Sequence, residues 1–328
     1  MVLRRCIVPA AALGALLAGC SGTTSVPPLS TQAASQSVDG ARGPLRSEPD
    51  TASAALYVSD AIGKSVFRFV RNANGTLQTP AGSSLVLSYN PFAIAVRGMD
   101  LYVTNQVNNA VDVFKAGATG SAKAKRTLLL QFEPTSVAVD ANGYLFVGGS
   151  TNGYVAVFAP GAHGSATPVQ EIALPDRHPD INGVAVDGAG NLYMSDTNEV
   201  SEFTTPTSNP TLARAIIGSG QQNVPSGMAI DPSGEAYVVN SGDANVLAYS
   251  PTANGTSPPD LTISSNSPSL RGPIGDAVHG SDLYVTSGTQ AFGPPSVFVL
   301  NKGQGAQSPI QVVTGAYLAA PVGAALGP

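Results

Sequence analysis

The sequence predicts an all-β protein made of one small sheet repeated along the chain. Three observations lead to this expectation. A short aromatic motif recurs at nearly even spacing, Gly and Pro are abundant (36 and 26 of 328 residues), and 43% of the residues are hydrophobic while 11% are charged. Such a hydrophobic content supports a folded chain, and so many turn-forming residues favour short strands over long helices.

The aromatic motif has the form Leu-Tyr-Val. It occurs six times, with small variations and at intervals of 44 to 47 residues, at residues 56–58, 101–103, 145–147, 192–194, 236–238 and 283–285. A regular interval of this length is typical of repeat proteins, in which each copy forms one structural unit. We therefore expect six units.

Each unit contains four β-prone runs. The first run is exemplified by Gly-Val-Ala-Val at 183–186 of the fourth unit, and the second run is the aromatic motif itself. The third unit exemplifies the other two, with Val-Ala-Val-Phe at 155–158 as the third run and a weaker apolar stretch at 169–174 as the fourth. The turns between first and second runs, at 140–143, 187–190 and 231–234, have the form Asp-x-x-Gly, which suits a tight hairpin. We interpret them as structural turns, because they lack the further carboxylates of calcium loops.

A four-stranded unit with this period predicts the blade of a β-propeller. The repeat region opens at its second run, near Leu56, with no first run before it, and it ends at residues 321–326, which have the first-run pattern and no successor. We therefore expect the C-terminal run to be the innermost strand of the blade that holds the N-terminal runs. This pairing closes a six-bladed ring and leaves no exposed inner edge.

The N-terminus predicts export and lipid attachment. Arg4 and Arg5 precede an apolar stretch at 7–18, which is too short for a permanent membrane span. Leu-Ala-Gly-Cys at 17–20 resembles a bacterial lipobox, which implies cleavage before Cys20 and diacylglycerol on its sulfur; an ordinary signal peptide is the alternative. We expect a signal peptide at 1–19, the lipidated Cys20 with a flexible tether at 20–52, and the propeller at 53–328.

Cysteine and charge exclude several classes of function. Cys6 leaves with the signal peptide and Cys20 carries lipid, so the mature chain has no free thiol for disulfides, thiolate metal sites or nucleophilic catalysis. The formal net charge of −5 and the pI near 5.1 provide no basis for nucleic-acid binding.

The repeats resemble those of NHL and YVTN propellers. Residues 102–105 read Tyr-Val-Thr-Asn, which gives the second group its name, and residues 183–196 are similar to the NHL consensus. The resemblance implies a propeller fold but no single function, since such propellers include sensors, scaffolds and enzymes. The absence of Trp argues against WD-type, kelch and tryptophan-docked quinoprotein propellers.

Candidate ligand-binding residues lie in the loops between second and third runs and in the connections between units, which share one face of the ring. Variable loops on a rigid scaffold are where binding usually evolves, although solvated turns are the alternative for each residue. The candidates are Asp60, Asn105, Asp176, Arg177, His178, Asp180, Asn182, Asp196 and Asn240. The six motif aromatics, in contrast, hold equivalent positions, which predicts packing between blades.

A metal-dependent lactonase-like hydrolase, or a lyase, is the enzymatic alternative. Six-bladed lactonases of the regucalcin and gluconolactonase type hold a divalent metal through a Glu, two Asn and an Asp in the channel. The corresponding positions here, just before the first-run Gly or its equivalent, are Phe92, Thr135, Asn182, Ser226, Ile274 and Val322. Only Asn182-Gly183 is similar to that family's Asn-Gly, and Asp276 is the one carboxylate within a first run. We therefore predict no metal site, no cofactor and no catalytic residue.

Together these observations predict a lipid-anchored, extracytoplasmic binding or interaction module of the bacterial cell envelope. Its ligand would be a protein, a glycan or a small molecule, and its membrane contact would be the N-terminal lipid. We expect a monomer and no nucleic-acid partner.

Overall fold

The computed structural model describes residues 55–80, 84–150, 153–174, 180–197, 199–217, 225–266, 268–288 and 294–328. All of them belong to one compact unit, Pro44–Pro328. The expected signal peptide, Cys20, the tether and the candidates Asp176, Arg177 and His178 lie outside the described residues. Within the described part, no helix has the length and apolar character needed to cross a bilayer.

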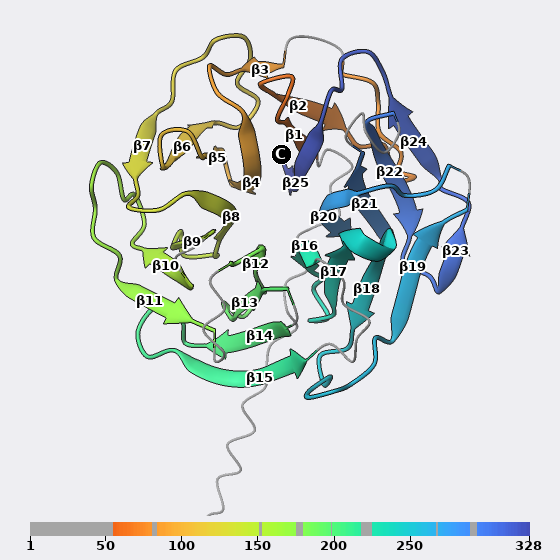
Figure 1. The fold of residues 1–328 in the computed structure, drawn as a ribbon. Helices are drawn as coiled ribbons and strands as arrows, with labels where there is room; N and C mark the ends of the chain where they lie inside the picture. The colour runs from red at the N-terminus through yellow and green to blue at the C-terminus, as the bar shows by residue number, and fades with distance from the viewer. Residues whose placement is uncertain are drawn as a thin grey trace, which may run out of the picture. The chain divides into compact units, whose positions relative to one another are not determined.

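The described residues form a six-bladed β-propeller, as the repeat predicted (Figure 1). From the axis outwards, blade 1 contains β25 (Pro321–Gly327), β1 (Ala55–Asp60), β2 (Ser65–Val70) and β3 (Leu85–Val86), and blade 2 contains β4 (Pro91–Arg97), β5 (Asp100–Asn105), β6 (Ala110–Lys115) and β7 (Arg126–Leu129). Blade 3 contains β8 (Pro134–Val139), β9 (Leu145–Gly149), β10 (Tyr154–Phe158) and β11 (Gln170–Ala173), and blade 4 contains β12 (Gly183–Val186), β13 (Leu192–Ser195), β14 (Glu199–Thr204) and β15 (Thr211–Ile217). Blade 5 contains β16 (Pro225–Ile230), β17 (Ala236–Asn240), β18 (Asn245–Tyr249) and β19 (Leu261–Ser265), with a short 3-10 helix η1 (Ser241–Asp243), and blade 6 contains β20 (Pro273–His279), β21 (Asp282–Ser287), β22 (Ser296–Asn301) and β24 (Gln311–Thr314).

The ring has two faces with different connections. All neighbouring strands within a blade are antiparallel. The turns between first and second strands and the loops between third and fourth strands therefore share one face, here called the turn face. The loops between second and third strands and the connections between blades share the other, here called the connection face.

Blade 1 is closed by the C-terminal strand, which confirms the predicted closure. β25 pairs with β1 in antiparallel register, with Leu56 opposite Leu326 and Val58 opposite Ala324. At the connection face, the Asp60 carboxylate accepts hydrogen bonds from the backbone N–H groups of Ala319 (2.6 Å) and Ala320 (2.9 Å). The inner strand of blade 1 is thus fixed along its length and at its start.

Six clusters of buried side chains lie between successive blades, and each contains one of the six motif aromatics. One cluster joins Tyr57 of blade 1 to Leu101 and Phe114 of blade 2, and another joins Tyr284 of blade 6 to Leu56 and Phe67 of blade 1. All six aromatic side chains are at most 5% exposed. The predicted packing role of the aromatic motif is confirmed.

A second set of contacts links each blade to the outer strand of the preceding one. The loop before the fourth strand reaches back, and at four joints a glycine of that loop forms parallel backbone pairs with the outer strand: Gly120, Gly164, Gly255 and Gly305, the last within β23 (Gly305–Gln307). All four glycines have positive φ, between 58° and 84°, which other residues rarely adopt. We call these contacts clasps.

The other two joints use a glutamine side chain as the clasp. Gln311 of β24 donates from Nε2 to the Leu77 carbonyl (2.9 Å) and accepts from the Leu77 N–H (2.6 Å), which joins blade 6 to blade 1. Gln170 of β11 donates to the Ser208 carbonyl of blade 4 at 2.9 Å. A primary amide presents the same donor and acceptor as a peptide group, so it can replace a backbone pair.

The Asp-x-x-Gly turns have the structural role that the sequence predicted. One carboxylate oxygen of Asp140 accepts hydrogen bonds from the backbone N–H groups of Asn142 (2.9 Å) and Tyr144 (2.8 Å), and Asp187 and Asp231 do the same in their turns. These carboxylates therefore complete turns on the turn face.

We predict that deleting residues 320–328 unfolds or aggregates the protein. The deletion removes β25 and the Ala320 N–H group that donates a hydrogen bond to Asp60, and it exposes the edge of β1. The expected loss of several kcal/mol is comparable to a typical total stability of about 5–15 kcal/mol. A circular permutant that joins Pro328 to Ala55 and opens the turn at 232–233 keeps every strand and should melt near the wild-type temperature. A truncated protein with an unchanged melting temperature would falsify the role of β25.

Candidate functional site

The residues that line the central channel are placed there by irregularities of the inner strands. Five of the six inner strands show a register shift near the connection face, for example between Pro91 and Ile94 in β4. Such a bulge turns a side chain away from the blade. Hydroxyl groups of second strands bond the freed backbone groups: Thr104 Oγ1 accepts from the Ala93 N–H at 2.9 Å, and Thr286 Oγ1 accepts from the Gly275 N–H at 2.9 Å.

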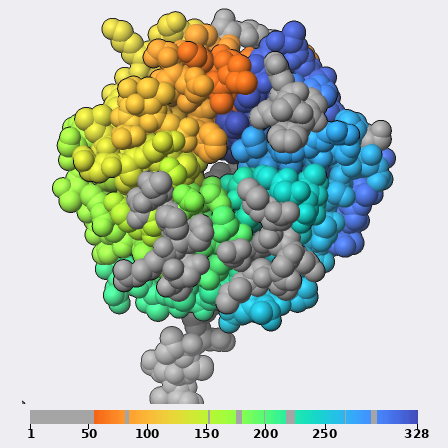
Figure 2. Space-filling view, in the orientation of Figure 1, coloured from red at the N-terminus to blue at the C-terminus, as the bar shows by residue number. Residues whose placement is uncertain are grey.

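The channel contains a cavity of about 80 Å³, room for a few water molecules. Its lining consists of three consecutive residues from each inner strand or its start, so it has three levels of six residues. The level nearest the connection face is formed by Phe92, Thr135, Asn182, Ser226, Ile274 and Val322, the six positions that the sequence singled out. Figure 2 shows a narrow opening at the centre of the ring.

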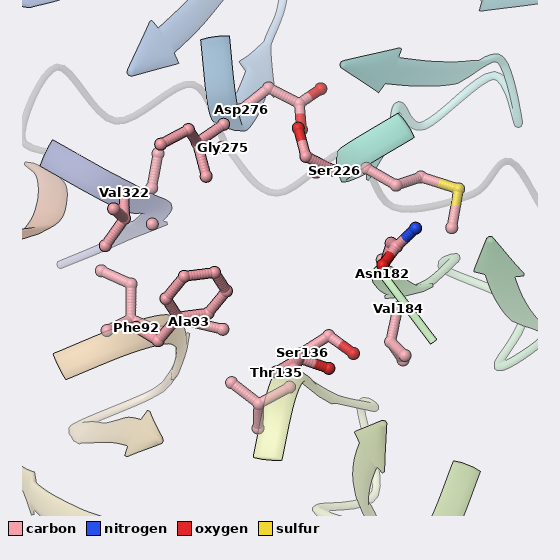
Figure 3. A pocket seen from close by; sticks show the side chains of 18 residues that line it. Phe92, Ala93, Thr135, Ser136, Asn182, Val184, Ser226, Gly275, Asp276 and Val322 are labelled. Atoms are coloured by element: carbon pink, nitrogen blue, oxygen red, sulfur yellow. The ribbon is translucent and has the colours of Figure 1, made fainter. Parts of the chain in front are cut away.

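The polar side chains of the lining come from blades 3 to 6, whereas blades 1 and 2 contribute apolar ones, as Figure 3 shows for Phe92 and Val322. Two of the hydroxyls are held by the protein: Thr135 Oγ1 donates to the Ile181 carbonyl (2.7 Å), and Ser226 Oγ lies 2.7 Å from Ser241 Oγ. Ser136 Oγ is buried and has no hydrogen-bond partner. The channel thus has one polar sector with an unused hydrogen-bonding group.

Asp276 is the exceptional residue of the channel wall. At the equivalent position the other blades have aliphatic side chains that contribute to the packing between blades, namely Ile94, Val137, Val184, Met228 and Ala324. Asp276 is 6% exposed, and neither carboxylate oxygen has a hydrogen-bond partner in any other residue that the structure describes. The missing side chain of Gly227 leaves it room, since a Cβ there would lie 3.2 Å from Asp276 Oδ1.

Burial raises the pKa of Asp276 well above its usual range, because the charged form loses its hydration. The strands packed against β20 contribute three titratable groups, Tyr237 of β17 and Asp282 and Tyr284 of β21. None of the three contributes to the shift: burial raises the pKa of Asp276, and the backbone N–H of Asp276 itself opposes this in part. No Lys, Arg or His lines the cavity, so this site suits a neutral or cationic polar group and not an anion.

The predicted site residues fall into two sets. Asn182 lines the channel, and Asp180 lies two residues before it, half-buried. Asp60, Asn105, Asp196 and Asn240 are at most 2% exposed, at the connection-face ends of four different second strands or just beyond them. The structure therefore does not bring these four residues together.

The buried candidates have hydrogen bonds within the protein. The Asn105 side chain donates to Asp112 (3.1 Å) and accepts from the Asn108 N–H (3.2 Å). Asp196 accepts from the Glu199 N–H at 2.7 Å, and Asn240 donates to the Asn245 side chain at 3.0 Å. These bonds stabilise loop conformations, and contact with a ligand stays a prediction for all four.

Ser136 is the channel residue that sequence reasoning missed. It occupies the level of the first-run Gly, where four of the six units have Gly, so its hydroxyl was a visible departure from the pattern. Within the described residues, no three His, Cys, Asp or Glu side chains group closely enough to hold a metal ion.

Comparisons with known proteins agree with the fold. A family model described as a beta-propeller repeat (SBBP) matches residues 131–155, and no curated protein matches significantly. A chain from the crystal structure of a nidogen/laminin complex is similar, with a TM-score of 0.63 and 15% identity over 83% of this chain and 98% of that chain.

Two further solved structures are similar. A protein of unknown function from Bacteroides caccae has a TM-score of 0.60 and 9% identity over 84% of this chain and 98% of that chain. Virginiamycin B lyase from Staphylococcus aureus has a TM-score of 0.48 and 13% identity over 69% and 71%. At these identities the likeness concerns the fold alone: the chain is a six-bladed propeller that contains a beta-propeller repeat.

We predict that Asp276→Val stabilises the protein at neutral pH by about 1–3 kcal/mol, because it replaces a buried carboxyl that bonds no other residue with the valine that blades 3 and 4 have at this position. The folded state holds the proton of Asp276 more tightly than the unfolded state, whose pKa is about 3.9. Asp276 therefore lowers stability progressively as pH rises above about 4, and the advantage of valine should shrink towards pH 4.

Melting curves of both proteins between acidic and neutral pH measure this difference. Asp282→Val is the matched control, because Asp282 is equally buried but pairs with Arg71 at 2.8 Å. Its loss should destabilise the protein by about 3–5 kcal/mol. Destabilisation of similar size by Asp276→Val would mean that Asp276 has a stabilising partner.

Proposed function

We propose that this protein is a lipid-anchored binding module of the bacterial cell envelope, with propeller repeats of the NHL/YVTN type. Residues 1–19 direct export, diacylglycerol on Cys20 anchors the mature chain, and the propeller lies outside the cytoplasm. More than one acyl chain on the N-terminus gives stable anchoring, where a single chain is marginal.

The observation that supports binding is the polar sector of the channel. Unused buried hydrogen-bonding groups lower the stability of a protein unless something else bonds them. Ser136 and Asp276 both have such groups, in a wall whose equivalent positions are otherwise small or aliphatic. A ligand that inserts a neutral or cationic polar group into the channel from the connection face would bond them.

The same lining favours binding over metal-dependent hydrolysis. Ca²⁺ is held by six to eight oxygen ligands and Mg²⁺ by six, and carboxylates are among them in typical protein sites. The level that contains Asn182 has no carboxylate, and three of its six residues, Phe92, Ile274 and Val322, are apolar. A lactonase-like hydrolase or lyase is therefore the alternative function, and metal binding and lactone hydrolysis distinguish it from a binding module.

We predict that Cys20 carries the lipid. Wild-type protein produced in a bacterial host should show diacylglycerol mass on its first mature residue, and Cys20→Ser should remain an unprocessed precursor or be released unacylated. Mass spectrometry of the N-terminal peptide measures both. A wild-type protein without acyl mass would contradict the anchor and leave the binding proposal untouched.

We predict no thermal stabilisation by Ca²⁺, Zn²⁺ or Mn²⁺ and no EDTA-sensitive hydrolysis of sugar lactones. A metal at 100 times its Kd would stabilise the fold by about 2.7 kcal/mol, which melting curves detect easily. A metal-induced shift that disappears in Asn182→Ala, together with lactone turnover, would establish the enzymatic alternative.

The same purified protein tests binding directly. Asn182→Trp obstructs the channel level nearest the connection face, and His163→Trp places the same bulk on an exposed loop of the turn face. Envelope components captured by wild type and by His163→Trp, but not by Asn182→Trp, would be ligands of the channel. Equal capture by all three proteins would contradict a channel site.

A further inference from the structure

Positive charge on the described ring is concentrated at one end of blade 2. Four of the seven exposed Lys and Arg residues in the described part of the chain lie there: Arg97, Lys115, Lys123 and Lys125. With the half-buried Arg126 they form what we call the basic end. It belongs to the turn face, because it consists of the turn between β4 and β5 and the loop between β6 and β7.

The backbone register brings these residues together. Arg97 is opposite Asp100 across the turn, Asp100 is opposite Lys115, and Arg126 is opposite Val113 in the neighbouring pair of strands. Lys123 and Lys125 lie in the loop that leads to Arg126, so five basic residues spread over 30 positions of the chain lie at one end of one blade.

One carboxylate partly offsets the charge of the basic end. Asp100 forms ion pairs with Lys125 and with Arg126, the latter at 3.2 Å. Burial tends to raise the pKa of Asp100, but the hydrogen bonds from Lys125 and Arg126 outweigh this effect and lower it. Asp100 is thus ionised at neutral pH. Arg97, Lys115 and Lys123 form no ion pair with any residue that the structure describes, so a clear positive excess remains.

The far side of the turn face is acidic. Blades 4 and 5 place Asp187, Glu235 and Asp260 there, whereas Asp231 is buried and paired with Lys302 at 2.6 Å. A surface that attracts the basic end would therefore contact the ring at blade 2, since blades 4 and 5 would be repelled by it.

Two further features of the basic end point to a lipid surface. The turn between β4 and β5 presents Met99, whose side chain is 54% exposed between Arg97 and Asp100. The chain also enters the ring on this face: β1 begins at Ala55, which packs in the same core cluster as Ala116 of blade 2. The segment that leads to Cys20 therefore joins the ring beside the basic end.

We propose that the basic end of blade 2 docks on anionic lipid headgroups and turns the connection face, with its channel, away from the membrane. Clustered Lys and Arg residues are attracted to anionic bilayers, and a neighbouring apolar side chain can enter the headgroup region. This inference rests on the proposed anchor for its setting, since lipid on Cys20 would keep the ring close to the bilayer.

The test uses the mature chain with Cys20→Ser, so that acylation plays no part. We expect it to sediment with vesicles that contain about 30% phosphatidylglycerol in phosphatidylcholine, and much less with phosphatidylcholine alone. Each basic residue raises the partition coefficient of the protein on anionic vesicles roughly fivefold. The double variant Lys115→Glu with Lys123→Glu should therefore lower this coefficient at least about 25-fold. High salt should have the same effect.

The matched control is Lys64→Glu with Arg271→Glu, which makes the same change in net charge on the connection face. Its partition coefficient on anionic vesicles should lie within about twofold of that of the parent protein, because salt confines the electrostatic attraction to about 10 Å from the bilayer. Both double variants replace exposed residues, and melting curves verify that they fold.

Three outcomes would overturn the proposal: equal sedimentation with both vesicle types, equal weakening by both double variants, or tighter binding to a soluble polyanion such as heparin that depends on Lys115 and Lys123. The last outcome would indicate a soluble anionic polymer as the partner. Failure of acylation at Cys20 leaves this result unchanged, so the two proposals fail separately.

Discussion

The pairing of β25 with β1 is the interaction on which the rest of the structure depends. It joins the two ends of the described chain within one blade, and through that blade it brings Tyr284 of blade 6 against Leu56 of blade 1. The channel exists only when all six inner strands are present, because each supplies three of its lining residues. The positions of Asn182 and Asp276 in the channel wall thus depend on β25, a strand that is distant from both residues in the sequence.

The repeat made much of this arrangement predictable. Six copies of a repeat with four β-prone runs predicted six four-stranded blades. The unmatched run at 321–326 predicted that the C-terminal strand completes the first blade. Aligning the repeats also identified the six channel residues from Phe92 to Val322, because equivalent positions in a ring face the same axis. The internal repeat thus indicates which residues share a level of the channel, which a sequence without repeats would not show.

The loop candidates were harder to predict, because their surroundings come from distant residues. Asp60 is polar and ends a strand, where exposed loop residues also occur, yet two of its partners are the N–H groups of residues 319 and 320, far away in the sequence. Ser or Thr recurs just before this position in several blades, as Ser59, Thr104 and Thr286. Their hydroxyl groups bond backbone groups of the inner strands, so the recurrence was a signal that the ends of the second strands have a structural role. The basic end was equally hidden, because its residues meet only through strand register.

The direction of the clasps has a consequence for synthesis on the ribosome. Each loop reaches back to the blade made before it, so a new blade finds its docking partner already present. Blade 1 is the exception, since the Gln311 clasp, the Arg71–Asp282 pair and β25 all require blade 6 or the strand that follows it, which are made after the other five blades. The growing chain can therefore assemble as an open arc of blades, and the two ends of the arc pair only once the residues of β25 have emerged.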